Sequence, residues 1–395
     1  MKLLKLETAI ASCLRDIKPK KKIIIPLASA CGHVIAENLC SRRNSPPSDL
    51  SAMDGYAFMH DVNFRENHTL SIIGKSPAGV TFETNVGKGE AVKVYTGSVI
   101  PFGTDTVVIQ ENTKTNANNL ILKKIPKKNE NTRRKGFDFK TGDILIKEGT
   151  KLTPKHISLA ASMNHTTLSV YIKPKIAIIS NGNELVEPGS KDSQNKIISA
   201  NNFGIKAYIE QLGAIAEDHG IAKDDIKSLR AKIKKASSND IIVTIGGASV
   251  GEFDLVKDSI RKELELKFWK IAMRPGKPLI YGRLGKVHFL GLPGNPVSAL
   301  VCCQLFLKPM INKLMNFKEE NLYITQAKLK VALNENDERQ DYMRAFYKDG
   351  FVTPNKVQDS SSLSALNSSN VFIIREPNAP PKKAGELVKI LRIDF

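Results

Sequence analysis

The sequence predicts a multidomain α/β and β protein, in which a doubly wound α/β domain with glycine-rich anion-binding loops is joined to β-rich domains. Three observations predict it. From Lys175 onward, short apolar runs alternate with amphipathic segments, which is typical of a parallel sheet covered by helices on both faces. Elsewhere, short alternating runs are separated by Gly, Asn and Pro, which favours strands and turns. The length of 395 residues exceeds what one hydrophobic core usually supports.

The chain is expected to begin with an amphipathic helix, because apolar residues recur there at helical spacing, namely Leu3, Leu6, Ile10, Leu14 and Ile17. A mostly β segment should follow to about residue 140, with strands near 90–95 and 106–109. In the α/β region, strands at 176–180, 214–221 and 240–245 should alternate with helices at 201–212 and 226–235. Gly213 should end the first of these helices. Strands at 323–331 and 387–393 should form a last β-rich region.

Three glycine-rich loops, each directly after a short apolar run, are the most informative local feature. They read GGASVGEFD at 246–254, RPGKP at 274–278 and GLPGNP at 291–296. Glycine lets the backbone approach a ligand, exposed N–H groups attract phosphate, and Arg274 and Lys277 add positive charge. The loops therefore predict a pocket for a phosphorylated or otherwise polyanionic ligand. GGASVG by itself matches no standard phosphate-binding motif, so a plain turn stays open for it.

The α/β fold also predicts where these loops meet. Ligands of open parallel sheets bind outside the carboxyl ends of the strands. The segments at 181–184 and 223–225 should therefore share one edge of the sheet with the three glycine-rich loops. Asp254 falls in the first turn of a helix expected from residue 253, where it either faces the pocket or caps the helix.

Composition narrows the choice of partners. The formal net charge is +19, but Lys and Arg are dispersed and aromatic residues make up only 6%, so no specific nucleic acid is expected. Five cysteines without C-x-x-C spacing and seven scattered histidines argue against a zinc site. We recognise no apolar leader and no stretch that approaches a membrane span, so we expect a cytoplasmic protein with no membrane partner. The serine-rich segment at 357–370 is expected to be a solvated, flexible linker.

Nine motifs, in order along nearly the whole chain, resemble those of molybdopterin molybdenumtransferases. They are SPPSDLSAMDGYA (45–57), VYTGSVIPFGTDTVV (94–108), RRKGFDFKTGD (133–143), SNGNEL (180–185), KDD (223–225), GGASVGEFD (246–254), FWKIAMRPGKP (268–278), GLPGNPVSA (291–299) and VQDSSSLSAL (357–366). These enzymes insert molybdenum in the last step of molybdenum-cofactor synthesis, and the C-terminal part of gephyrin is similar to them. The resemblance implies a transferase that acts on adenylylated molybdopterin and molybdate, releases AMP and uses a divalent cation, usually Mg²⁺.

The resemblance also implies four regions and a homodimer. The regions are a linking domain I at 22–41 and 142–173, a β-rich domain II at 42–141, an α/β molybdopterin-binding domain III at 1–21 and 174–317, and a C-terminal β domain IV at 318–395. The active site is implied to lie between domain III of one subunit and domain II of its partner. A molybdopterin adenylyltransferase is implied as a further partner.

Two sets of side chains are expected, by resemblance, to carry the chemistry. Carboxylates would hold the cation, and basic residues would neutralise phosphate and oxyanion. The implied catalytic set is Asp54, Asp138, Glu184, Asp224 and Asp254, of which Asp54, Asp224 and Glu184 are the implied metal ligands. The implied substrate-binding set is Thr96, Arg133, Gly246, Gly247, Ser249, Gly251, Lys270, Arg274, Lys277, Pro293 and Pro296.

The chain departs from the family pattern at several places. Ser98 and Ala248 replace commoner small residues and should be tolerated. Residues 181–184 read Asn-Gly-Asn-Glu where Thr-Gly-Asp-Glu is usual, and the neutral amide of Asn183 should bind a cation more weakly than a carboxylate. Arg274 stands where lysine is frequent, which exchanges a compact donor for a planar fork. Two alternative functions stay open. One is a molybdopterin adenylyltransferase-like enzyme, which would match only about residues 175–314, and the other is a noncatalytic dimeric scaffold, as in gephyrin's receptor anchoring.

Overall fold

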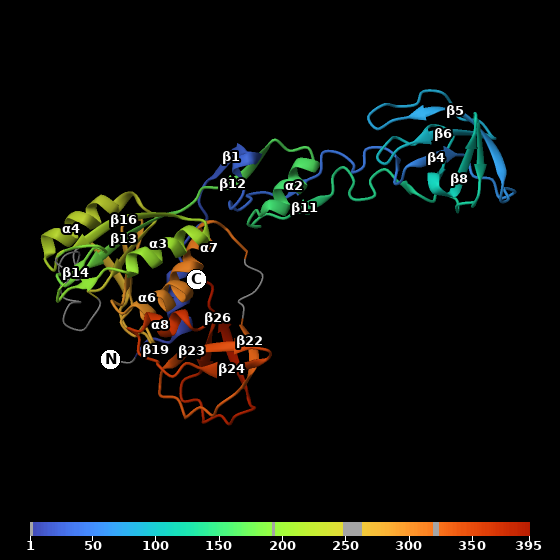
Figure 1. Cartoon of the computed structure of the whole chain (residues 1–395). Helices are drawn as coiled ribbons and strands as arrows, with labels where there is room; N and C mark the ends of the chain where they lie inside the picture. Colours follow the sequence, from blue (N-terminus) through green and yellow to red (C-terminus); the bar gives the residue numbers. More distant parts are fainter. Residues whose placement is uncertain (1–2, 192–193, 248–262, 319–323) are drawn as a thin grey trace.

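The computed structural model describes residues 3–191, 194–247, 263–318 and 324–395. Figure 1 shows an extended molecule with a helix-covered sheet and a small β-domain at one end and a second β-rich domain at the other. A slender linking domain joins them, and the chain passes through it twice. The predicted class, a multidomain α/β and β protein, is confirmed. The residue boundaries given above for the four regions stay a prediction.

The α/β domain is built on a six-stranded sheet in the order β16-β13-β17-β21-β20-β18. The first four strands are parallel, and β20 and β18 extend the sheet as antiparallel strands. Since helices cover both faces, β13 and β17 are continuous apolar runs rather than alternating ones. The strands are β13 (Lys175–Asn181), β16 (Ile215–Ala222), β17 (Ile241–Ile245), β18 (Leu264–Phe268), β20 (Ile280–Leu284) and β21 (Val287–Leu292), and a short pair, β14 (Leu185–Val186) and β15 (Ile197–Ile198), follows β13.

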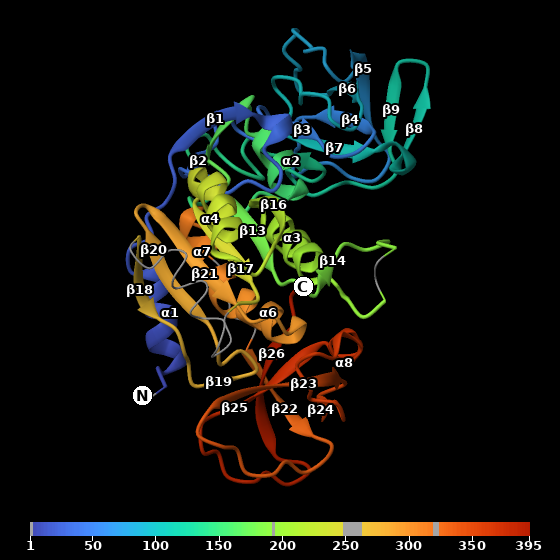
Figure 2. The same cartoon turned by 90° about the vertical axis from the view of Figure 1, so that its left-hand side faces the viewer.

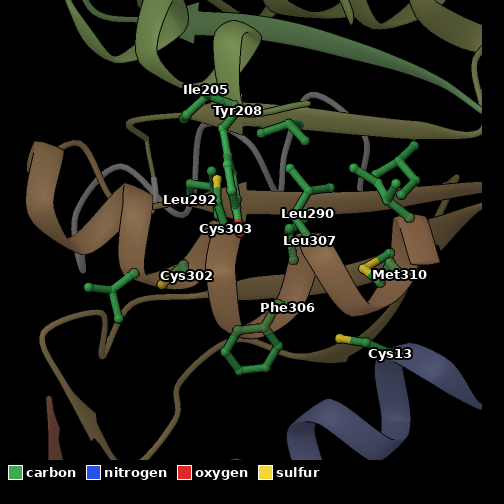
Figure 3. Close-up of a cluster of buried hydrophobic side chains, with 14 of the residues drawn as sticks. Cys13, Ile205, Tyr208, Leu290, Leu292, Cys302, Cys303, Phe306, Leu307 and Met310 are labelled. Atoms are coloured by element: carbon green, nitrogen blue, oxygen red, sulfur yellow. The ribbon is translucent and has the colours of Figure 1, made fainter. Parts of the chain in front are cut away.

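Helices pack on both faces of this sheet and form two separate cores. On one face, Ile176 and Ile178 of β13 pack with α1, α3 and the helix that runs from α6 through the π-helical turn η4 into α7. On the other face, Ala177 and Ile179 pack with α4. Figure 3 shows Tyr208 of α3 reaching toward the long helix, with α1 on the other side of that helix. The bounds are α1 (Leu6–Leu14), α3 (Asn201–Leu212), α4 (Ile226–Lys235), η3 (Ala236–Ser238), α6 (Pro296–Cys302), η4 (Cys303–Leu307) and α7 (Lys308–Leu314).

The predicted helices α1, α3 and α4 are confirmed, and α1 begins later than expected. The helix expected from residue 253 lies outside the described residues. Helix α3 ends at Gly213, whose φ of 95° is the left-handed conformation that glycine adopts most easily. Helix α4 begins after Asp225, whose carboxylate accepts a hydrogen bond from the backbone N–H of Ser228 at 2.7 Å. Helix α1 does not include Leu3, because the neighbouring Leu4 forms a backbone bridge with Ile271. Tertiary pairing there overrides the helical pattern.

The expectation that no stretch approaches a membrane span is wrong by length and composition. The continuous helix Pro296–Leu314 has 19 residues and a mean hydropathy of 1.2. However, 72% of it is buried inside the fold, where it packs against the sheet and α1. Its apolar character is therefore explained by the core of the α/β domain.

The C-terminal domain is a five-stranded barrel beside the α/β domain (Figure 2). Strands β23, β24, β22, β26 and β25 follow one another, and the pairing of β23 with β25 closes the ring. A two-residue strand from the α/β domain, β19 (Met273–Arg274), adds to β23 and joins the two domains. The other bounds are β22 (Ile324–Leu329), β23 (Gln340–Lys348), β24 (Phe351–Pro354), β25 (Val371–Arg375), β26 (Leu387–Arg392) and α8 (Leu363–Asn367).

The linking domain and the β-rich domain are both built from strands that lie far apart in the sequence. In the linking domain, β1 pairs with β12 and β2 with β11, beside helix α2. In the β-rich domain, a six-stranded sheet has the order β7-β4-β6-β5-β9-β8, and β3 pairs with β10. The bounds are β1 (Lys22–Pro26), η1 (Leu27–Ser29), β2 (Leu39–Cys40), β3 (Leu50–Ser51), β4 (Gly55–Phe58), β5 (His68–Ser76), β6 (Glu90–Val94), β7 (Thr106–Ile109), η2 (Gln110–Asn112), β8 (Thr113–Asn116), β9 (Asn119–Leu122), β10 (Thr132–Arg133), β11 (Ile144–Ile146), α2 (Pro154–Ser162) and β12 (Thr167–Tyr171).

One buried histidine should make the stability of the α/β domain depend on pH. His288 is 5% exposed, its Nδ1 lies 2.9 Å from the Tyr281 hydroxyl, and that hydroxyl donates to the Cys13 carbonyl of α1 at 3.1 Å. Burial lowers the pKa of His288 from 6.5 to about 4. Since the unfolded chain then binds a proton that the folded chain excludes, the free energy of unfolding should fall as the pH falls from about 6.5 toward about 4.

The expected loss that His288 contributes is about 2 kcal/mol between pH 7 and pH 5. Denaturant unfolding at the two pH values should show a smaller loss in His288→Gln than in the unsubstituted protein, because glutamine does not titrate. An equal loss in both proteins would mean that His288 is not the group responsible.

Candidate functional site

A cavity of about 560 Å³ opens at the carboxyl ends of the parallel strands. Three of its walls come from segments that directly follow β13, β17 and β21. The predicted convergence of the 181–184 segment with the glycine-rich loops is therefore confirmed for these three. The lining residues are Asn181, Glu184, Gly246, Gly247, Met273, Arg274, Pro275, Gly276, Lys277, Pro278, Pro293, Gly294, Asn295 and Ser298 from the α/β domain, and Arg339, Gln358, Asp359 and Ser360 from the barrel.

Two glycines in the wall are required by close packing. Gly246 has a φ of 84°, and a Cβ atom there would lie 2.6 Å from the Asn181 carbonyl oxygen. Gly276 has a φ of 111°, and its Cβ would lie 2.7 Å from the Cys302 sulfur. Any other residue would be strained and would push the loops apart. These glycines hold backbone directly against the cavity, as the sequence predicts.

The acidic side chains of this edge form a small connected group. Both carboxylate oxygens of Asp224 accept hydrogen bonds, one from the Asn181 side-chain amide at 3.1 Å and one from the Asn183 backbone N–H at 2.8 Å. In return, the Asp224 backbone N–H donates to the Asn183 side-chain oxygen at 3.2 Å. The Glu184 carboxylate folds over Gly182, where a Cβ would meet its two oxygens at 2.5 and 2.6 Å. Of the two predicted ligands, Glu184 lines the cavity, whereas Asp224 does not line it and is bonded to the lining residue Asn181.

The basic side chains predicted here have different surroundings. Lys277 is exposed and lines the cavity. Arg274 also lines it, but its guanidinium forms ion pairs with Asp337 at 3.1 Å and Asp341 at 2.5 Å, which raise its pKa. Arg274 follows no strand of the sheet, since β19 belongs to the barrel ladder. Arg274 therefore joins the α/β domain to the barrel as well as facing the ligand site.

The remaining predicted residues of the α/β domain are less central. Lys270 does not line the cavity, and its ammonium lies 3.9 Å from the centre of the Trp269 ring. Pro293 lines the wall, whereas Pro296 opens helix α6 just behind it. Ser249, Gly251 and Asp254 lie outside the described residues. Their assigned roles stay predictions.

The other four predicted residues belong to the segment predicted as the β-rich domain, whose sheet lies at the opposite end of the molecule from the α/β domain (Figure 1). Asp54 lies just before β4, and one of its oxygens accepts hydrogen bonds from the Thr96 backbone N–H at 2.7 Å and from the Thr96 hydroxyl at 2.9 Å. These bonds lower the pKa of Asp54, so it is ionised at neutral pH. Arg133 ends β10, and Asp138 follows a few residues later with an exposed side chain.

The barrel supplies wall residues that sequence reasoning missed. The segment at 357–370 is an ordered part of the wall and not a linker, since it carries helix α8 and is tied to the α/β domain. The Asn295 side chain donates to the Ser360 hydroxyl at 2.7 Å, and the Val297 backbone N–H donates to the Ser360 carbonyl at 3.1 Å. Arg339 adds a further cation. The VQDSSSLSAL motif could have indicated that this segment belongs to the site, but its serine content favoured the interpretation as a linker.

Comparisons with known proteins agree with this architecture. Three family descriptions match in succession: "MoeA N-terminal region (domain I and II)" over residues 4–164, "Probable molybdopterin binding domain" over 177–313, and "MoeA C-terminal region (domain IV)" over 326–393. The fold and the cavity thus define a multidomain protein of the MoeA type with a molybdopterin-binding α/β domain.

Similarity over the whole length identifies the family more narrowly. The chain is 36% identical to the molybdopterin molybdenumtransferase of Haemophilus influenzae over 401 residues, with 98% of each chain covered. It is 35% identical over 301 residues to that of a Nostoc species, covering 74% of this chain and 69% of the relative. A crystal structure of the molybdopterin biosynthesis MoeA protein from Pyrococcus horikoshii matches with a TM-score of 0.86 and 26% identity, covering 99% of this chain and 100% of the other. The chain belongs to the molybdopterin molybdenumtransferase family.

The planar guanidinium of Arg274 should stabilise the junction between the α/β domain and the barrel. In Arg274→Lys, a single ammonium cannot reach Asp337, Asp341 and Asn336 together, and Asp341 is only 7% exposed. We expect the free energy of unfolding to fall by about 1–2 kcal/mol, measured by denaturant titration. The matched control is Arg230→Lys, whose surface pair with Glu263 should change stability by less than about 0.5 kcal/mol. If both substitutions lower the free energy of unfolding equally, the Arg274 ion pairs do not stabilise the junction more than a surface ion pair does.

Proposed function

We propose that this transferase inserts molybdenum into adenylylated molybdopterin, consumes molybdate, and releases AMP. Membership in the molybdopterin molybdenumtransferase family supports the transfer of molybdenum to molybdopterin. The observation that supports the finer statement is the cavity, whose wall combines glycine backbone, the cations of Arg274, Lys277 and Arg339, and the Glu184 carboxylate. Asp224 is bonded to the lining residue Asn181. Such a cavity suits a ligand with separate anionic groups, such as a pterin phosphate and an oxyanion.

The basic wall would bind and orient the anionic groups. Lys277 is a compact exposed charge, whereas Arg274 is fixed in place by its acidic partners in the barrel. Because Gly246 and Gly276 have no side chain, phosphate oxygens could approach the backbone closely. Holding two anions at fixed positions removes much of the entropic and electrostatic barrier to their reaction.

The acidic end of the cavity fits a hard divalent cation such as Mg²⁺. Its donors are all oxygens: the Glu184 and Asp224 carboxylates and the Asn181 side-chain carbonyl, which has no hydrogen-bond partner in the described part of the chain. Among the described residues no group of three or more His, Cys, Asp or Glu is placed so that it could hold a metal ion, so waters and ligand oxygens would have to complete the shell. When bound, the ion would polarise a phosphate oxygen and offset its charge.

We propose that the complete site forms between two copies of the chain. Asp54, Thr96, Arg133 and Asp138 lie on the β-rich domain at the opposite end of the molecule from the cavity (Figure 1). A second copy could bring that domain to the cavity. Large exposed apolar side chains support an association, among them Ile24 at 75%, Phe137 at 76% and Phe102 at 79% exposed. We further propose that the protein is a homodimer located in the cytoplasm. A molybdopterin adenylyltransferase would supply its substrate.

Two alternatives have different consequences. A molybdopterin adenylyltransferase-like enzyme would need only the α/β domain, and it leaves the Asp54–Thr96 pair without a role. A noncatalytic scaffold, or a nucleic-acid-binding protein that uses the +19 charge, would not need the hydrogen-bonded carboxylates at the cavity. Nucleic-acid binding would also weaken steeply with salt.

The function is tested by incubating the protein with adenylylated molybdopterin, molybdate and Mg²⁺. AMP release together with molybdenum bound to the pterin is the expected result. Formation of adenylylated molybdopterin from molybdopterin and ATP would favour the adenylyltransferase alternative. Absence of both reactions would favour the scaffold.

Removing the Asp54 carboxylate should abolish insertion without affecting the fold. Asp54 is exposed and its carboxylate is hydrogen-bonded to Thr96, so Asp54→Ala should keep its circular dichroism spectrum and its elution volume in gel filtration. Product formation should fall by about 100-fold or more. Asp61→Ala is the control, because Asp61 is a half-buried carboxylate of this domain that likewise accepts a hydrogen bond from a backbone N–H, that of Asn63. Normal activity in Asp54→Ala would remove Asp54 from the site.

Restoring the usual carboxylate at Asn183 should strengthen cation binding. Asn183 is hydrogen-bonded to the Asp224 backbone, so an added negative charge would lie close to the proposed ligands. Asn183→Asp should lower the Mg²⁺ concentration that gives half-maximal AMP release. An unchanged Mg²⁺ dependence would place this position outside the coordination shell.

A further inference from the structure

Asn181 is the last residue of β13. Its side-chain nitrogen is hydrogen-bonded, and its side-chain oxygen is unpaired among the described residues. The residue is 4% exposed and lines the cavity. Its amide nitrogen donates to Asp224 at 3.1 Å. A carboxylate only accepts hydrogen bonds at neutral pH, so the NH₂ group must face Asp224 and the amide oxygen must point away. That buried oxygen has no hydrogen-bond partner among the described residues.

An unpaired buried carbonyl costs about 1–3 kcal/mol, so a bound ligand is expected to satisfy it. Burial alone does not make the argument, because Asn239 is also 4% exposed, donates to a carboxylate and has an unpaired amide oxygen. Asn239, however, precedes β17 at the opposite end of the sheet and does not line the cavity. Of these two buried amides, only that of Asn181 belongs to a residue that lines the cavity.

The surroundings of Asn181 favour a cation over a hydrogen-bond donor. The Glu184 carboxylate shares the same wall, and Asp224 is bound to the amide nitrogen. Neither carboxylate forms an ion pair within the described residues, and the ammonium of Lys196 donates to the Asn183 backbone carbonyl at 2.7 Å instead. Oxygen donors with unneutralised carboxylates are the environment that hard divalent cations prefer.

We propose that the Asn181 amide oxygen is a direct ligand of the divalent cation at this site, beside Glu184 and Asp224. The proposal rests on the function proposed above and extends it to a residue where the usual motif has threonine. One side chain then does two things: its oxygen binds the ion, and its NH₂ group fixes the orientation of Asp224, a second ligand. A neutral ligand also adds no further negative charge next to two carboxylates.

The test is Mn²⁺ binding to the full-length protein, followed by electron paramagnetic resonance and by calorimetry. Asn181→Ala should weaken Mn²⁺ binding by about tenfold or more. Asn239→Ala, which removes an equally buried and equally unpaired amide away from the cavity, should bind Mn²⁺ as the unsubstituted protein does. Asn181→Thr, which carries the usual residue at this position, replaces the alanine variant in this test if that variant does not fold. It should also bind Mn²⁺ more weakly than the unsubstituted protein.

Unchanged Mn²⁺ affinity in the Asn181 variants would overturn the proposal. If the Asn181 variants keep their Mn²⁺ affinity but bind adenylylated molybdopterin more weakly, the amide oxygen accepts a hydrogen bond from the substrate, and the proposal is also overturned. Absence of Mn²⁺ binding by the unsubstituted protein would overturn it as well. The test also separates this inference from the proposed function. If Mn²⁺ binding needs Asn181 but no AMP is released, only the proposed function is contradicted. If AMP is released but Mn²⁺ binding does not need Asn181, only this inference is contradicted.

Discussion

The parallel order of β13, β17 and β21 is the constraint on which the site depends. These three strands are neighbours in one sheet and run in the same direction, so their carboxyl ends lie side by side. The strand end at Asn181 and the segments that carry Gly246 and Pro293 must therefore meet. Helices on both faces bury the strands and fix their register. A cavity lined by loops far apart in the sequence is the direct result.

The barrel completes this cavity because the two domains share a backbone ladder and a set of charges. Strand β19 leaves the α/β domain to pair with β23, and Arg274 at its end pairs with Asp337 and Asp341. Arg339 also binds Asp337 and lowers its pKa to about 2, so that carboxylate stays ionised between the two guanidinium groups. The Asn295–Ser360 hydrogen bond closes the opposite side. The shape of the cavity and the position of the barrel are thus physically connected.

The sequence could predict the parts that depend on local pattern. Helices α3 and α4 match their predicted ranges, because apolar periodicity, Gly213 and Asp225 are all local signals. It could not predict what tertiary pairing decides. Leu4 joins Ile271 instead of extending α1, and β19 joins the barrel rather than the sheet. The serine-rich wall segment lacks an apolar pattern, since its order comes from contacts with Asn295 and Val297. Lys270 was grouped with Lys277 by motif, but only Lys277 lines the cavity.

The central claim is that Asp54 of one subunit acts at the cavity of another. Mixing subunits that carry Asp54→Ala with subunits that carry Glu184→Ala tests it directly, because each variant alone should be inactive. Random pairing would make about half of the dimers mixed, and each mixed dimer would hold one intact site of two, so about a quarter of the normal insertion activity should return. Mixed dimers that form, as shown by two different affinity tags, but stay inactive would contradict the account.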